Sequence, residues 1–201
     1  MSSSRHRYLR RAELPVDTVE LARFLLGKFV VHDTRAGRLS GRIVETEAYP
    51  IGDPAAHSYR GQTPRNRSMF LKRGHAYVYF IYGTSYALNV SGEVPGVGGA
   101  VLVRAIEPRE GIELMQRHRG TTRLIDLTRG PGRLAQALGI DRAYDGLDMC
   151  SPGPLRLAVN AEKTGRVGTS VRIGLTRAAH RGLRFYERGN VFVSGPKRLL
   201  K

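Results

Sequence analysis

The segment GRIVETEAY at residues 41–49 decides how this chain is expected to fold and where its chemistry lies. Side chains alternate between the two faces of a strand, so Ile43, Glu45 and Glu47 share one face, with two carboxylates two residues apart. Either one carboxylate points into solvent near the strand end, or crowding and partial burial raise the proton affinity of one, as acid–base chemistry often requires. Two solvated carboxylates at a strand edge are the plainer alternative.

A helix and a hairpin are expected on the N-terminal side of this segment. Residues 29–32 and 41–46 predict two antiparallel strands joined by a turn at residues 36–37. Asp17, with Glu20 three residues later, resembles a capping box and predicts a short amphipathic helix before these strands.

A second hairpin is predicted at residues 76–90, where a tyrosine-rich run meets a glycine. Gly83 suits the first central position of a type II′ turn with Thr84, so Tyr82 is expected at the hairpin tip. Alternation lets Tyr79 line a pocket while Tyr82 projects from the other face. Two further rings of this strand are expected to pack in the core, Tyr77 and Phe80.

The C-terminal half predicts further strands and two helices. Strands are expected at residues 100–106, 170–175, 183–186 and 191–194, and helices at residues 112–120, opened by Pro108, and 130–139. The chain is expected to form one α+β domain at residues 14–201, a curved and mostly antiparallel β-sheet flanked by a few α-helices. A basic arm at residues 1–13 is expected to be mobile, either along a phosphate backbone or as a solvated tail.

The charge balance points to a polyanionic partner. The 201 residues are 41% hydrophobic, enough to bury the core of one domain. Lys and Arg number 33 against 17 Asp and Glu, a formal net charge of +16. All but five of the basic residues are arginine, whose planar fork suits phosphates. A GC-rich genome would also favour arginine, but codon bias does not explain the net charge.

The cysteines and histidines of the sequence do not predict a metal site. Cys150 is the single cysteine, which excludes an internal disulfide and a multi-cysteine cluster. None of the six histidines stands in a metal-binding motif, so no metal is expected. No apolar run reaches transmembrane length, and no signal-type apolar stretch follows the N-terminus. The chain is expected to be soluble and monomeric, and cytoplasmic on the nucleoid of a prokaryote, or nuclear in a eukaryote.

Two polar segments are candidates for contacts with nucleic acid. Residues 50–67 form a long loop, and loops of this length are usually functional or disordered. Gly130 and Gly132 flank a proline at a predicted helix start, with Arg129 and Arg133 beside it. Open N–H groups at a helix N-terminus bind phosphates, although such glycines can also serve only to start the helix.

Several blocks of the chain, in one order, resemble the alkyladenine DNA glycosylase family, the 3-methyladenine DNA glycosylases of the AAG/MPG type. The match runs from about residue 14 to residue 194. Its blocks are GRIVETEAY (41–49), AAHS (55–58), QTPRNRSMF (62–70), YVYFIYG (77–83), LVRAIEP (102–108) and LRFY (183–186). The family's fold is similar to the C-terminal domain of a formyltransferase, which fits the predicted α+β sheet.

The resemblance implies a monofunctional enzyme of base-excision repair. Such an enzyme flips an alkylated or deaminated purine out of double-stranded DNA and hydrolyses its N-glycosidic bond, leaving an abasic site. Its substrates are of the 3-methyladenine, 7-methylguanine, hypoxanthine and ethenoadenine class, and it needs neither metal nor cofactor.

The resemblance also assigns roles to single positions. Glu47 matches the general base that activates the attacking water, and Arg104 with the backbone near His57 matches groups that help to hold this water. Asn89 matches an amide that disfavours guanine, and Tyr82 the side chain that fills the vacated stack. The flipped base is expected to be sandwiched by Tyr49, His57 and Tyr79. Contacts with the DNA backbone are expected from Arg65, Arg67, Arg129 and Arg133.

Two other functions stay open at this point. A non-catalytic nucleic-acid-binding module of the same fold would explain the charge and the tyrosines. It leaves Glu47 unexplained, because a carboxylate among arginines and rings repels phosphate. A lyase-type glycosylase using Lys72 as a Schiff-base nucleophile is a chemical alternative.

Overall fold

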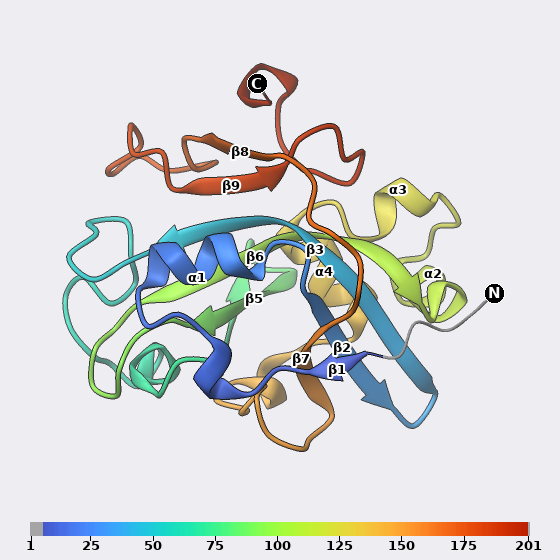
Figure 1. Ribbon diagram of the computed structural model, residues 1–201, viewed down its shortest axis with the longest axis horizontal. Coiled ribbons are helices and arrows are strands. Elements are labelled where there is room, and N and C mark those ends of the chain that lie inside the picture. Colours follow the sequence, from blue (N-terminus) through green and yellow to red (C-terminus); the bar gives the residue numbers. More distant parts are fainter. Residues whose placement is uncertain (1–5, 201) are drawn as a thin grey trace.

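Strand β3 (Gly37–Tyr49) is the central strand of the sheet, and it contains the whole GRIVETEAY segment. The computed structural model describes residues 6–200 of the chain (Figure 1). β3 pairs antiparallel with β2 (Phe29–Thr34), as the sequence predicts, and with β6 (Ala100–Glu110) on its other edge. Register shifts near residues 43–46 interrupt the pairing with β6, and such bulges bend a strand.

The remaining strands extend this sheet on both sides. Its order is β1-β7-β2-β3-β6-β5-β4, and all neighbouring pairs are antiparallel. The added strands are β1 (Arg7–Tyr8), β4 (Ala76–Ile81), β5 (Ser85–Ser91) and β7 (Leu155–Val159). The last two strands are β8 (Val167–Ser170) and β9 (Arg184–Glu187), which pair with each other. β9 also pairs with residues 45–47 of β3, beyond the part of β3 that pairs with β2. The predicted α+β domain with a mostly antiparallel sheet is confirmed.

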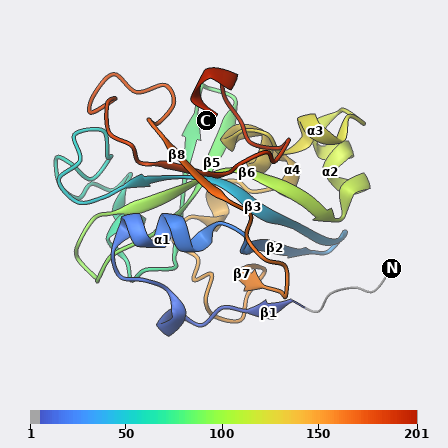
Figure 2. The ribbon, with the colours of Figure 1, turned by 45° about the horizontal axis from the view of Figure 1, so that its top comes forward.

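Helices cover the sheet at two places. α1 (Thr18–Leu25) packs against β3 and β6, and the Asp17 carboxylate caps it by accepting from the N–H groups of Val19 and Glu20, both at 2.8 Å. α2 (Ile112–Arg119), α3 (Leu124–Leu127) and α4 (Pro131–Leu138) gather at one end of the sheet, away from α1 (Figure 2). α4 packs on β5 and β6. A single large apolar cluster joins Leu21 of α1, Ile43 of β3 and Leu134 of α4.

The helix start predicted at Pro108 is wrong. β6 continues through Pro108 to Glu110, and α2 begins after Gly111, whose φ of 73° lies in the left-handed region. Opposite β3, the register steps from Pro108 to Glu110. Proline is tolerated in a sheet at such an irregularity because one ladder donor is dispensable there.

The second hairpin forms as predicted, but its turn lies one residue earlier. The N–H of Thr84 donates to the carbonyl of Ile81 at 3.2 Å, so Tyr82 and Gly83 are the central residues. Both have positive φ, 53° and 68°, which is the pattern of a type I′ turn and not of type II′. Tyr82 therefore occupies a backbone conformation that is uncommon for a large side chain.

Two strands predicted near the C-terminus are absent from the described chain. β8 ends at Ser170, and residues 191–194 form no strand. The reason lies in their N–H groups: Ile173 donates to the Glu47 carboxylate and Ser194 to the Glu45 carboxylate, at 2.8 and 2.6 Å. These donors bond buried side chains instead of a neighbouring strand.

Part of the N-terminal arm expected at residues 1–13 lies within the described residues. Arg7–Tyr8 pair with β7, the N–H of Leu9 donates to the carbonyl of Leu157, and the Leu9 side chain is buried. Arg7 also forms an ion pair with Glu13. Residues 6–13 thus pack on the sheet, because β7 offers them a free edge; residues 1–5 lie outside the described part.

Candidate active site

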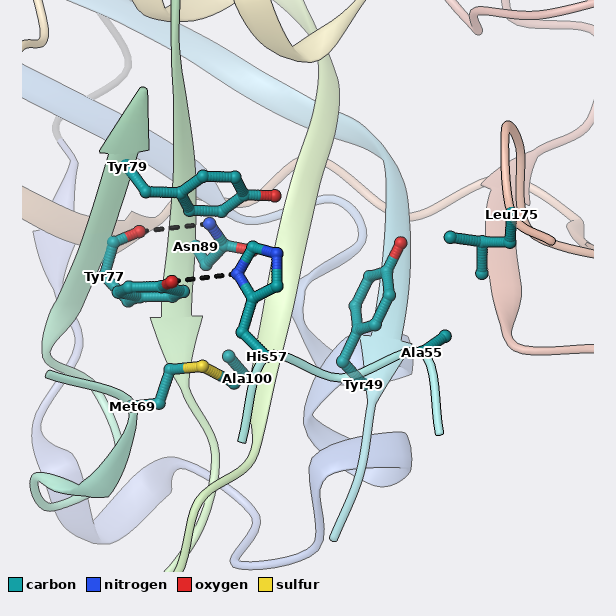
Figure 3. Close-up of a pocket in the computed structure, with 9 residues that line it drawn as sticks. All are labelled: Tyr49, Ala55, His57, Met69, Tyr77, Tyr79, Asn89, Ala100 and Leu175. Atoms are coloured by element: carbon teal, nitrogen blue, oxygen red, sulfur yellow. Dashed lines mark hydrogen bonds between the residues drawn. The ribbon is translucent and has the colours of Figure 1, made fainter. Parts of the chain in front are cut away.

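A ring-lined pocket opens beside the end of β3 (Figure 3). It contains about 410 Å³ of space free of protein atoms, part of which is open to solvent. Tyr49 comes from the end of β3, His57 from the loop at residues 50–66, and Tyr79 from β4. The three rings expected to hold a flipped base thus line one cavity, together with Asn89 of β5.

The rings on the β4 side of the pocket support one another. His57 and Tyr79 lie with ring centroids 4.6 Å apart at 73°, an edge-to-face contact, and Tyr77 stacks on Tyr79 at 5.1 Å. The ring nitrogen Nδ1 of His57 is 2.9 Å from the Tyr77 hydroxyl, and Nδ2 of Asn89 donates to the Tyr77 carbonyl at 3.0 Å. Tyr77 is buried, as predicted, and in addition fixes its neighbours in the pocket wall.

The surroundings of His57 favour its neutral form. Burial lowers the pKa of His57, and the positive charge of Arg65 lowers it further. A neutral imidazole presents an uncharged wall to a cationic base and is a weak proton donor near neutral pH.

Glu47 lies next to Tyr49, whose ring lines this pocket, and the Glu47 side chain is 0% exposed. Its oxygen Oε1 accepts from the N–H of Ile173 at 2.8 Å. The other oxygen, Oε2, accepts from Nη1 of Arg104 at 3.2 Å and from the Tyr49 hydroxyl at 3.0 Å. Three donors on three segments of the chain therefore fix this carboxylate.

Glu45 shares Arg104 with Glu47, so the two carboxylates lie on one face of β3 as alternation predicts. Its Oε1 accepts from Nε of Arg104 at 3.1 Å and from Nε of Arg184 at 2.6 Å, and its Oε2 from the N–H of Ser194. The side chain of Glu45 is also 0% exposed. The expectation of a solvated carboxylate is wrong for both residues, because each side chain is buried and forms an ion pair with an arginine.

Arg104 is the shared cation of this array. Burial lowers its pKa, but the charges of Glu47 and Glu45 outweigh this effect and raise the pKa above its usual value. Arg104 therefore stays charged, and its cost of burial is offset by two carboxylates.

A second buried ion pair, between Arg172 and Asp53, joins two loops over the site. Both side chains are fully buried, Nη2 of Arg172 donates to Asp53 at 3.1 Å, and Nη1 donates to Asp53 and to the carbonyl of Ala48. The guanidinium lies 4.6 Å from the Tyr49 ring centroid. This pair places Ile173 against Glu47.

Several of these residues were missed from the sequence. Leu175 lines the pocket beyond Tyr49 (Figure 3), and no role was predicted for it. Asp53, Arg172 and Ile173 were missed too, because their partners are distant in sequence. A charged residue inside an alternating apolar run was the one available signal for Arg172.

The hairpin tip holds the most exposed tyrosine that the structure describes. Tyr82 is 88% exposed. The start of α4 touches this hairpin, since a Cβ on Gly132 would lie 3.0 Å from Cβ of Ser85. Phe80, predicted to be a core residue, is 49% exposed at the sheet edge because β4 has no further strand beyond it. It shares a surface hollow with Tyr79 and Arg65.

The four arginines proposed for backbone contacts differ in their surroundings. Arg65 and Arg67 are exposed in the loop at residues 50–66 and at the start of the short helix that follows it. Arg129 donates from Nε to the carbonyl of Val193 at 2.8 Å, and Arg133 forms an ion pair with Asp126 at 3.0 Å.

Three further observations concern metals, lysine and membranes. Within residues 6–200, no group of three or more His, Cys, Asp or Glu side chains could hold a metal ion. Lys72 is exposed and does not line the pocket. No helix in this described part is long and apolar enough to cross a membrane.

A buried carboxylate beside a ring-lined pocket, on a strongly basic protein, suits an enzyme that acts on nucleic-acid bases. The chain matches the family model of methylpurine-DNA glycosylases (MPG) over residues 12–191 and belongs to this family. It is therefore a monofunctional DNA glycosylase, a hydrolase of DNA repair that acts on DNA.

Relatives in three organisms agree with this family. A protein of Mesorhizobium japonicum named "Putative 3-methyladenine DNA glycosylase" is 62% identical over 194 residues, covering 96% of this chain and 93% of the relative. Proteins of the same name are 54% identical over 192 residues in Paraburkholderia phytofirmans (96% and 90% covered) and 48% identical over 182 residues in Methanoculleus marisnigri (89% and 94% covered).

Proposed function

We propose that this glycosylase flips alkylated or deaminated purines out of double-stranded DNA and hydrolyses their N-glycosidic bond with a water activated by Glu47. The substrates are of the 3-methyladenine, 7-methylguanine, hypoxanthine and ethenoadenine class. The observation that carries the proposal is a fully buried carboxylate, held by three donors, directly beside the ring that walls the pocket.

The proposed reaction needs one base and one water. Glu47 takes a proton from the water while the water oxygen forms a bond to C1′ of the deoxyribose. The C1′–N bond breaks, its electron pair leaves with the purine, and the sugar keeps the new hydroxyl as an abasic site. An alkylated purine leaves as a neutral base, so it needs little acid assistance.

The pocket walls suit such a leaving group. Ring faces of Tyr49 and Tyr79 attract a cationic purine, and neutral His57 adds no opposing charge. For neutral lesions the depressed pKa of His57 makes this residue a poor acid. Asn89, fixed by its bond to the Tyr77 carbonyl, is proposed to disfavour guanine through its exocyclic amino group.

The surface around the pocket is proposed to handle the DNA itself. Tyr82 enters the gap left by the flipped base, since its ring is largely exposed to solvent at a tight turn. The backbone contacts are assigned to Arg65, Arg67, Arg129 and Arg133.

The proposal is tested by incubating the purified protein with duplex oligonucleotides carrying hypoxanthine, ethenoadenine or 7-methylguanine, followed by alkali. Strand cleavage at the lesion is expected, with none in the matched undamaged duplex. Absence of cleavage on all three substrates would favour the non-catalytic binding module of the same fold. Borohydride is expected to trap no covalent adduct, and an adduct lost in Lys72→Ala would show the lyase mechanism instead.

A further inference from the structure

We infer that the hydroxyl of Tyr49 is a positioning group for catalysis, which fills Oε2 of Glu47 and leaves Oε1 as the oxygen that takes the proton from water. This inference rests on the proposed function and goes beyond the role of the Tyr49 ring as a pocket wall. It begins with the strand: residues two apart on β3 share a face, which brings the hydroxyl to 3.0 Å from Oε2.

The hydrogen bonds of Glu47 distinguish its two oxygens. A carboxylate has about four acceptor positions, two on each oxygen. Oε2 already accepts twice, from Arg104 and from Tyr49, whereas Oε1 accepts once, from the N–H of Ile173. One position remains, and it lies on Oε1. A water that keeps a hydrogen bond to this carboxylate therefore binds Oε1.

The Tyr49 hydroxyl is a permanent donor in this arrangement. Burial, and then the adjacent charge of Glu47, raise the pKa of Tyr49, so the phenol keeps its proton at any working pH. Its bond to an ionised carboxylate is charge-assisted and stronger than a bond between neutral groups. The other charges around Glu47 are Arg104, which is shared with Glu45, and Arg172, which lies over the Tyr49 ring.

Tyr49 contributes its ring to the pocket wall and its hydroxyl to the general base Glu47, so binding of the purine and orientation of Glu47 are coupled. A purine packed on the Tyr49 ring restrains the ring, the ring restrains the hydroxyl, and the hydroxyl restrains Oε2. Without this donor, Oε2 keeps Arg104 alone and gains an open position for a second water that is not aimed at C1′. Removal of the Tyr49 hydroxyl is then expected to disturb the orientation of the Glu47 carboxylate and to leave the affinity for the lesion unchanged.

The variant Tyr49→Phe removes the hydroxyl and keeps the ring. Single-turnover excision of 7-methylguanine from duplex DNA is expected to fall by about 10-fold, the size of one charge-assisted hydrogen bond. The dissociation constant for the lesion duplex is expected to stay within about threefold of wild type. The matched variant is Tyr144→Phe, which removes a hydroxyl from a ring that packs against His32, outside the pocket lining and outside the hydrogen bonds of Glu47. A fall as large in Tyr144→Phe would overturn the inference.

A double-mutant cycle separates positioning from a general structural effect. In the Glu47→Gln background, Tyr49→Phe is expected to change the residual rate by less than about twofold, because the group through which it acts is gone. An equal loss in both backgrounds, a loss confined to affinity, or no loss at all contradicts the inference. Wild-type protein that excises no lesion would instead contradict the proposed function.

Discussion

The end of β3 and the tip of the β4–β5 hairpin differ in how far their functional side chains are buried. On β3, Glu45 and Glu47 are 0% exposed, and each accepts three hydrogen bonds. At the hairpin tip, Tyr82 is 88% exposed in a left-handed backbone conformation. The chain thus fixes the groups proposed for chemistry before DNA arrives, and leaves the proposed wedge exposed to solvent.

The charges follow the same division. The buried array around the site contains three carboxylates, Glu45, Glu47 and Asp53, and three arginines, Arg104, Arg172 and Arg184. Its formal charge is zero, although the whole chain carries +16. The positive excess therefore lies outside this array, where it can attract DNA over distances of about a Debye length.

The largest effect is expected from breaking the buried array. Glu45→Gln removes one charge and leaves Arg104 and Arg184 buried with too little compensation. The free energy of unfolding, measured in urea, is expected to drop by about 3–5 kcal/mol. The control is Glu20→Gln on the exposed side of α1, which is expected to cost less than about 1 kcal/mol. Similar losses in both variants would contradict the claim that the buried array contributes more to stability than an exposed carboxylate.

The hairpin tip is expected to behave in the opposite manner. Tyr82→Asn removes the ring and suits the left-handed backbone, so stability is expected to stay within about 0.5 kcal/mol. Single-turnover excision is expected to fall by about 10-fold in duplex DNA and much less in single strands, where little stacking needs to be replaced. Equal losses on both substrates would identify Tyr82 as a pocket residue.

How far the sequence predicts each region depends on the range of the interactions. The α1 cap at Asp17 and both hairpins follow from local pattern and are confirmed. The turn at Tyr82 was placed one residue late because the glycine was assigned to the first central position instead of the second. Local sequence patterns thus predict the helix cap and the hairpins, but not the exact turn type at Tyr82.

The buried array could not be predicted in full, because its bonds are non-local. The donors of Ile173 and Ser194 lie 126 and 149 residues from their carboxylates. The alternating pattern around both donors therefore predicted strands that do not form. Strand alternation singled out Glu47, and the family resemblance assigned roles to Glu47 and Arg104, whereas Asp53 and Arg172 belong to no motif that the sequence displays.

The smallest effect concerns the surface charge. Arg65 is exposed on the loop beside the pocket. Arg65→Ala is expected to weaken DNA binding severalfold at most and to flatten the plot of log affinity against log salt by about 0.9. Arg38→Ala is the control, because Arg38 pairs with Asp33 at the opposite end of β3. An unchanged slope in Arg65→Ala would remove Arg65 from the DNA contacts.

The most direct test of the account is single-turnover excision by Glu47→Gln, with lesion-duplex binding measured on the same protein. Glutamine keeps the shape and most hydrogen bonds of the side chain but is no base. Excision is expected to fall by about 10²-fold or more while the dissociation constant stays close to that of wild type. Excision by Glu47→Gln at nearly the wild-type rate would contradict the claim that Glu47 activates the water.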